Sequence, residues 1–175
     1  MVVWHRSGRL VAMKTATAIV LILAPTLALA WSESAHHVIA LLAYERLSEA
    51  ERDKLQAIIA AHPCYAEDFN APPNVRDVDR WRIGRAAYWP DVARKLPEYN
   101  RPNWHWELGA LKRIAFSKAP EGDTFLPEGA TLESRNLHLA QAIKLCQRVA
   151  NDPGVDDSDR ALAISWLSHL EAVPE

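Results

Sequence analysis

Three histidines and one aspartate, far apart in the sequence, are of types that could bind a metal ion. They are His36, Asp91, His105 and His169. Imidazole nitrogens and a carboxylate oxygen are ligands that suit zinc. Each also has a structural alternative, because a buried histidine can be a hydrogen-bonded core residue and an exposed aspartate can form a solvated ion pair. Their chemistry therefore depends on whether the fold brings them together.

The N-terminal segment predicts export of the protein. Basic residues precede an apolar run over residues 18–24, and a small-x-small site ends at Ala30. These are the parts of a secretory signal peptide. We expect residues 1–30 to be that peptide, with Met13 as an alternative start, and residues 31–175 to be a secreted or periplasmic mature domain.

Cleavage after Ala30 would create another set of metal donors. Trp31 would then carry a free α-amine beside its own carbonyl, and His36 lies five residues further on. Amine, carbonyl and imidazole together could chelate a metal ion, with the indole excluding water. The alternative is that Trp31 is only the first core residue of a secreted domain.

Composition limits the classes of partner. The chain has 175 residues, is 49% hydrophobic and carries a formal net charge of −2, so no broad cationic surface attracts duplex nucleic acid. No second apolar run could span a bilayer, so we expect no membrane partner after cleavage. Cys64 and Cys146 could form a disulfide in an oxidising compartment or remain two buried thiols.

Apolar spacing and capping residues predict an all-α fold. Residues 63–74 read as a proline-rich loop. The first helix should bury the face of His36, Ile39, Ala40, Ala43 and Leu47. The expected helices are Ala35–Leu47, a helix capped by Ser48 that runs to His62, Val75–Leu96, Leu132–Ala150 capped by Thr131, and Asp159–Leu170 capped by Ser158.

Four elements along the mature chain resemble those of a known enzyme family. They are Trp31 with His36, then Trp89-Pro90-Asp91 before Arg94, then Trp104-His105-Trp106, and finally Ser165-Trp166-Leu167-Ser168-His169. In this order they resemble the zinc-dependent nucleases of the S1/P1 type. Members of that family cut single-stranded DNA and RNA and remove 3′-phosphates from nucleotides.

The resemblance implies a fold, a cofactor and residue roles. It implies an all-α domain of the phospholipase C / P1 nuclease type with three zinc ions and a hydroxide held between two of them as the nucleophile. One zinc would take Asp91, His105 and His169, and another would take Trp31 and His36. Asp91 and Arg94 would act in catalysis. By the same resemblance, Trp106 would stack on an unpaired base and Arg94 would bind the phosphate.

The end of the chain departs from the family pattern. Val173 stands where the family has an aspartate that bridges two metals, and the ligands of the third zinc are absent. The resemblance therefore implies a domain that is incomplete at its C-terminus and has little activity alone, with at most one or two partial zinc sites. His62 and His138 lie outside the motifs and are interpreted as ordinary surface or packing residues.

Two other functional classes fit the same residues. Zinc-dependent phospholipases C also begin with tryptophan and use histidine and aspartate ligands on helices. The Trp104-His105-Trp106 element and Arg94 favour a nuclease over a phospholipase. A decayed fragment, or a periplasmic helical domain without catalysis, is the non-enzymatic alternative.

Processing of the exported protein tests the N-terminal prediction. Signal peptidase is expected to cut after Ala30, because the small-x-small site follows an apolar run. Intact-mass analysis or Edman sequencing of the secreted protein should give a chain that begins Trp-Ser-Glu. Any other mature N-terminus would remove the proposed chelate at Trp31.

Overall fold

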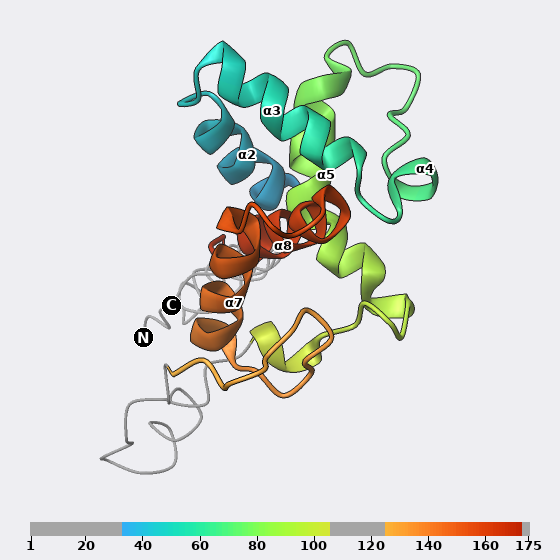
Figure 1. Ribbon diagram of the computed structural model, residues 1–175. Coiled ribbons are helices and arrows are strands. Elements are labelled where there is room, and N and C mark those ends of the chain that lie inside the picture. The colour runs from blue at the N-terminus through green and yellow to red at the C-terminus, as the bar shows by residue number, and fades with distance from the viewer. Residues whose placement is uncertain (1–32, 106–124, 173–175) are drawn as a thin grey trace, which may run out of the picture. The chain divides into compact units, whose positions relative to one another are not determined.

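Helices α5 and α8 occupy the centre of the fold, and the other helices pack on them (Figure 1). The computed structural model describes residues 33–105 and 125–172. Every regular element in these two ranges is helical, which confirms the all-α class. The elements are α2 (Glu33–Tyr44), α3 (Glu49–Ala60), α4 (Tyr65–Asp68), α5 (Val78–Val92), the 3₁₀ helices η2 (Ala93–Lys95) and η3 (Pro102–His105), α7 (Leu139–Asn151) and α8 (Asp157–Leu170).

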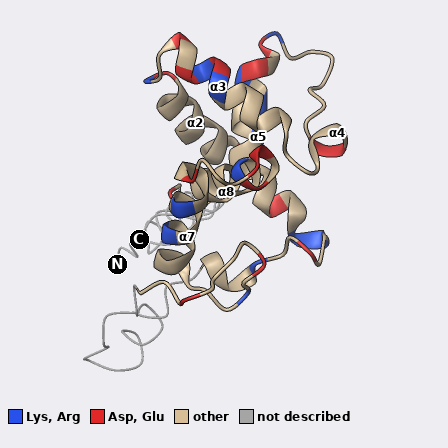
Figure 2. Cartoon of the chain, in the orientation of Figure 1, with Lys and Arg blue, Asp and Glu red and all other residues tan. Residues whose placement is uncertain are grey.

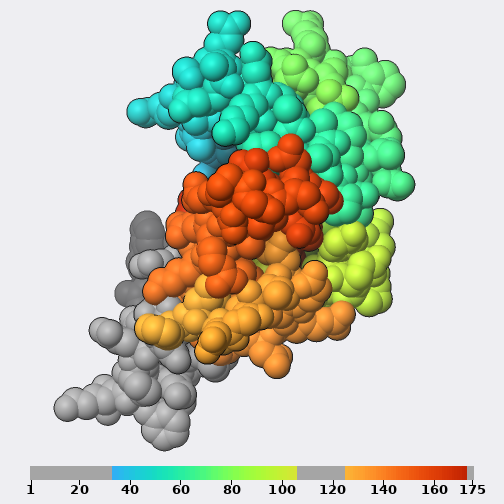
Figure 3. All heavy atoms as spheres, in the orientation of Figure 1, coloured from blue at the N-terminus to red at the C-terminus, as the bar shows by residue number. Residues whose placement is uncertain are grey.

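The core is built around three tryptophans. Trp89, Trp104 and Trp166 are at most 2% exposed, and the rings of Trp104 and Trp166 meet edge to face with centroids 4.8 Å apart. Helix α8 packs against α5, α7 and α3, and α2 packs against α5. In the space-filling view, the red atoms of α8 lie between the teal atoms of α3 and the orange atoms of the segment that begins at residue 125 (Figure 3).

The buried face of α2 differs from the predicted one. His36, Ala40 and Tyr44 are buried, at i, i+4 spacing, whereas Ile39 is 43% exposed and Ala43 is exposed. The helix is apolar on most of its surface, so periodicity alone did not define which row faces the core. His36 is on the buried row, as predicted.

Helix starts follow local capping chemistry at some positions and not at others. The predicted capping box at Ser48 is confirmed: the Glu51 N–H donates to the Ser48 hydroxyl, and the Ser48 N–H donates to the Glu51 carboxylate. Two predicted caps are wrong. Asp156, not Ser158, caps α8, and Thr131 lies in a turn with Ser134 eight residues before α7 begins.

Helix α5 is capped at its N-terminus by a side chain and ends shortly after a proline. The Asp77 side chain accepts a hydrogen bond from the Arg80 N–H at 3.0 Å. Pro90 has no N–H to donate to the carbonyl one turn earlier, and the α-helix ends at Val92. The tighter turn η2 then continues the chain, so Asp91 lies in the last turn of α5 and Arg94 in η2.

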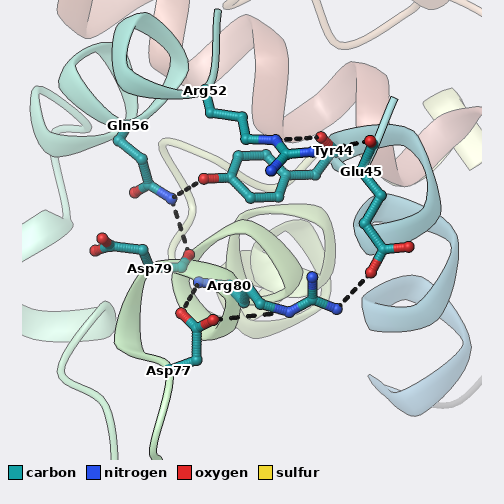
Figure 4. A network of polar contacts seen from close by, with 7 residues as sticks. All are labelled: Tyr44, Glu45, Arg52, Gln56, Asp77, Asp79 and Arg80. Atoms are coloured by element: carbon teal, nitrogen blue, oxygen red, sulfur yellow. Dashed lines mark hydrogen bonds and ion pairs between the residues drawn. The ribbon is translucent and has the colours of Figure 1, made fainter. Parts of the chain in front are cut away.

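A polar network fixes the end of α2 against α3 and the start of α5 (Figure 4). The Arg80 guanidinium lies 2.7 Å from the Glu45 carboxylate. Arg52 donates to the carbonyls of Tyr44 and Glu45 at 3.1 and 2.8 Å. Gln56 donates to the Asp79 carbonyl at 2.9 Å. The Glu45–Arg80 contact places the C-terminal end of α2 near the N-terminal end of α5, so the two helices run in opposite directions.

A buried arginine holds the segment that ends in His105. Arg101 is 3% exposed and donates to the carbonyls of Leu132 and Glu98, both at 2.7 Å. The Trp104 indole donates to the Ser134 carbonyl at 2.9 Å. These bonds tie η3 to the chain that precedes α7, and they fix the backbone on which His105 is carried.

Charged residues are spread over the surface of the helices. Acidic and basic residues alternate over the helices, while the visible length of α2 is mostly uncharged (Figure 2). Among the described residues, no helix combines the length and apolar character that a membrane span requires.

Cys64 and Cys146 are free thiols, so of the two alternatives the structure has the unpaired one.

His62 is a buried packing residue. It is 3% exposed, its ring meets the edge of the Trp89 ring with centroids 4.3 Å apart, and its Nδ1 accepts from the Cys64 N–H at 3.1 Å. Burial lowers the pKa of His62 to about 4, against a partial opposing effect of Asp68. The neutral ring is therefore the form that the core accepts.

Acid should destabilise the fold through His62. The pKa of His62 is lower in the folded chain than the unfolded value of 6.5. The neutral ring therefore contributes fully to the free energy of unfolding above pH 6.5, and this stabilisation is lost as the pH falls toward 4. Between pH 7.5 and 4.5 this group alone should cost about 2 to 3 kcal/mol of unfolding free energy. Urea titrations at both pH values should show that His62→Asn, which keeps an acceptor but does not titrate, loses that part of the pH dependence. An equal pH dependence in both proteins would contradict the assignment.

Candidate metal centre

The fold brings together side chains from four separate segments. His36 comes from α2, Asp91 from the end of α5, His105 from η3 and His169 from the last turn of α8. One donor atom each of His36, Asp91 and His169 lies within 4.8 Å of the other two. Residues separated by up to 133 positions in the chain therefore form one cluster.

A backbone hydrogen bond fixes the His169 ring. Its Nδ1 lies 3.0 Å from the carbonyl of Ala87, and the ring is 1% exposed. A carbonyl only accepts, so Nδ1 carries the proton and Nε2 keeps its lone pair. A backbone carbonyl bound to the far ring nitrogen is the usual arrangement behind a metal-ligating histidine.

His105 meets the free nitrogen of His169. The two Nε2 atoms are 2.9 Å apart, and the His169 Nε2 is 4.0 Å from an Asp91 oxygen. Two imidazole lone pairs at this distance repel each other unless a proton or a cation lies between them. Two nitrogens bound to one tetrahedral zinc would be about 3.3 Å apart, so the contact is close to the spacing of neighbouring ligands.

His36 offers an unused donor. It is 3% exposed, its ring stacks on that of His169 with centroids 4.2 Å apart, and its Nδ1 has no hydrogen-bond partner among the described residues. A buried polar atom without a partner costs about 1 to 3 kcal/mol. A cation bound by this nitrogen would satisfy it. The Nε2 of His62, outside the cluster, also has no partner within the described ranges, so the grouping of the three donors is the stronger indication of a metal ion.

Burial keeps the three imidazoles neutral. It is the first cause that lowers the pKa of His36 and of His105, and Asp91 opposes it in both cases. Burial, followed by the proximity of His36 and His105, lowers the pKa of His169 to about 3. Neutral imidazole is the form that binds a metal, so no deprotonation is needed at neutral pH.

Asp91 pairs with the nearby arginine. The Arg94 Nη2 is 2.6 Å from the Asp91 Oδ1, with side chains 60% and 18% exposed. Arg94 therefore lies at the open side of the cluster, where a ligand in solution could reach its guanidinium. The pair also places a positive charge beside one oxygen of the only carboxylate in the cluster formed by the described residues.

The structure groups these ligands differently from the family resemblance. The set with donors mutually within 4.8 Å is His36, Asp91 and His169, and His105 reaches it through His169. The resemblance instead assigned Asp91, His105 and His169 to one ion. Trp31, Trp106 and Val173 lie outside the described residues, so their predicted roles remain predictions.

Sequence reasoning did not assign three groups that support the cluster. They are the Ala87 carbonyl behind His169, the Trp166 ring whose centroid is 5.7 Å from that of His105, and the half-buried Tyr88, 6.2 Å from His36. A carbonyl has no signature in the side-chain sequence. Tyr88 could have been noticed, because it stands one helical turn before Asp91 on α5.

No protein-family model, characterised protein or solved structure matches this chain. The chemistry of the cluster is therefore inferred from its donor atoms. A site of imidazole nitrogens and one carboxylate suits zinc and other divalent transition metals better than calcium or magnesium, which prefer oxygen.

Removing the charge of Arg94 should strengthen metal binding. Its guanidinium competes for Asp91 and repels a cation, although its exposure keeps the effect modest. We expect Arg94→Ala to tighten zinc binding about two- to fivefold, measured by competition with a chromophoric chelator. Arg94→Lys keeps the charge and should stay near the wild-type affinity. Weaker binding by Arg94→Ala would show that the arginine supports the cluster instead of competing with the ion.

Proposed function

We propose that this chain carries the metal-binding part of a zinc-dependent hydrolase of phosphate esters, with single-stranded nucleic acid and 3′-nucleotides as substrates. The convergence of His36, Asp91 and His169, with His105 against His169, is the observation that carries the proposal. The order of the sequence motifs supports the nuclease class, as stated above. The unpartnered Nδ1 of His36 is a further donor that a cation could use.

The chain's own groups would hold and orient a zinc ion in defined ways. His36, Asp91 and His169 would be ligands, and three protein ligands with an open position is the usual count for a catalytic zinc. The Ala87 carbonyl would keep His169 in the tautomer with a free Nε2. A bound zinc supplies Lewis acidity, lowering the pKa of water and neutralising charge on phosphoryl oxygens.

Arg94 would bind the substrate phosphate. Its planar fork of donors suits an oxyanion, and its exposed side chain is held beside the cluster by Asp91. The neighbouring Tyr88 is half-buried against His36 and could bound the same opening. Substrate would therefore approach from the side of η2.

Metal binding is the direct test. The full chain should bind about one zinc ion in equilibrium dialysis, and His169→Ala and His36→Ala should abolish that binding because each removes one of the three proposed ligands. His62→Asn changes a buried histidine outside the cluster and should leave the zinc content unchanged. A wild-type chain without stoichiometric zinc, or unchanged zinc in both cluster variants, would overturn the proposal.

Substrate assays separate the enzyme classes. Zinc-dependent, chelator-sensitive hydrolysis of single-stranded DNA or a 3′-nucleotide would support the nuclease, whereas hydrolysis of phosphatidylcholine would favour the phospholipase alternative. Because Val173 cannot bridge two metal ions, turnover by this chain should be slower than that of a complete site by thousands-fold or more, on the order of several kcal/mol of barrier. Arg94→Ala should lower any hydrolysis while retaining zinc.

A further inference from the structure

A glycine in the middle of α5 lies directly under a histidine of α2. A Cβ atom added at Gly84 would be 2.5 Å from the His37 Nδ1 and 2.6 Å from its Cγ. These separations are far shorter than any ordinary contact, so only glycine allows the ring to lie on the α5 backbone. Glycine is costly in a helix interior relative to alanine, which makes a packing reason for it more plausible than a local one.

The same two helices form part of the metal cluster. His37 follows His36 on α2, and Gly84 precedes Asp91 by seven residues on α5. Seven residues are about two helical turns, so Gly84 and Asp91 share one face about 10 Å apart. The antiparallel helices therefore meet twice on this face, once through His37 on Gly84 and once through His36 beside Asp91.

The ring of His37 lies between Gly84 and the first turn of α2. Its Nε2 lies 3.7 Å from the Glu33 carboxylate one turn earlier on α2, and its side chain is 19% exposed. Rotating the ring away would not fully relieve a methyl group at position 84, because the His37 Cβ itself would be only 3.1 Å from it. Alanine at position 84 would therefore displace the α2 backbone as well as the ring.

We propose that Gly84 and His37 are positioning residues for the metal centre. The ring seated on Gly84 sets how closely and at what rotation α2 approaches α5, and this places the adjacent His36 against Asp91 and His169. The inference rests on the proposed metal-binding function and extends it to two residues that touch neither the ion nor the substrate. Metal sites tolerate errors of only a few tenths of an ångström in ligand position, so a small shift of α2 is enough to weaken binding.

Cobalt(II) in place of zinc gives a visible spectrum that reports the arrangement of the ligands. A substitution that affected only the stability of the fold would leave this spectrum unchanged. The full chain and its variants would be titrated with cobalt(II), recording affinity and the visible ligand-field spectrum, which reports coordination number. Gly84→Ala is expected to weaken binding about tenfold or more and to change the spectrum, with the far-ultraviolet circular dichroism unchanged. Gly154→Ala, in the loop at the opposite end of α8 from His169, is the matched control and should bind as wild type does.

A double-variant cycle tests the contact itself. In a His37→Ala background the two shortest contacts, at 2.5 and 2.6 Å, are gone and only the 3.1 Å contact to the Cβ at position 37 remains, which a shift of a few tenths of an ångström relieves. Adding Gly84→Ala there should therefore weaken cobalt binding by no more than about threefold. Should the single Gly84→Ala chain fail to fold, His37→Ala alone carries the test, since losing the ring frees α2 and should weaken binding about threefold or more.

The outcomes separate the two proposals. A wild-type chain that binds no cobalt or zinc would overturn the metal site and this inference with it. Normal metal binding by the wild type together with normal binding by folded Gly84→Ala would overturn only the positioning role. A full tenfold effect of Gly84→Ala that persists without the His37 ring would also overturn it, because the ring would not be the contact that matters.

Discussion

The hydrogen bond from the His169 ring to the Ala87 carbonyl links the two central helices and fixes the chemistry of the cluster. It joins the last turn of α8 to α5 at a point buried from water. By holding the proton on Nδ1, it leaves Nε2 free to face His105 and Asp91. If this bond were absent, the ring could turn and the donor atom would no longer point toward the other ligands. The direction of the donor atom therefore depends on this one hydrogen bond, and the extensive packing of α5 on α8 holds the bond in place.

Burial keeps the histidines of the cluster neutral, and it also makes the cluster unfavourable for the stability of the fold. Three imidazoles are kept neutral by desolvation, so they are available as ligands at neutral pH, but one of them has an unsatisfied nitrogen. The single carboxylate stays partly exposed and is neutralised by Arg94 at the surface. An arrangement of this kind stabilises the fold less than apolar side chains of the same volume would. A cluster of this kind therefore fits a binding site better than a purely structural role in the core.

Much of the helical framework could be predicted from local sequence signals. Where the prediction was wrong, the reason can be given for each helix. The capping box at Ser48 was found because both partners lie within one turn. The start of α7 was misplaced because Thr131 resembles a cap, although its N–H and the Ser134 hydroxyl instead close a turn. The outward position of Ile39 was missed because α2 is apolar around most of its circumference, and only packing against α5 decides which row is buried.

The sequence by itself determined the donor types and their order, and it placed His36, Asp91 and His169 on helices. His36, Asp91, His105 and His169 could be named as candidates because each stands in one of the four elements that resemble the nuclease family. Only the tertiary structure decided that His36 groups with Asp91 and His169, that His105 reaches the set through His169, and that a backbone carbonyl orients the ring. The physical reason is that donor distances depend on how closely and at what angle helices cross. Those quantities are set by long-range contacts such as the His37 ring on Gly84, which leave no periodic pattern in the chain.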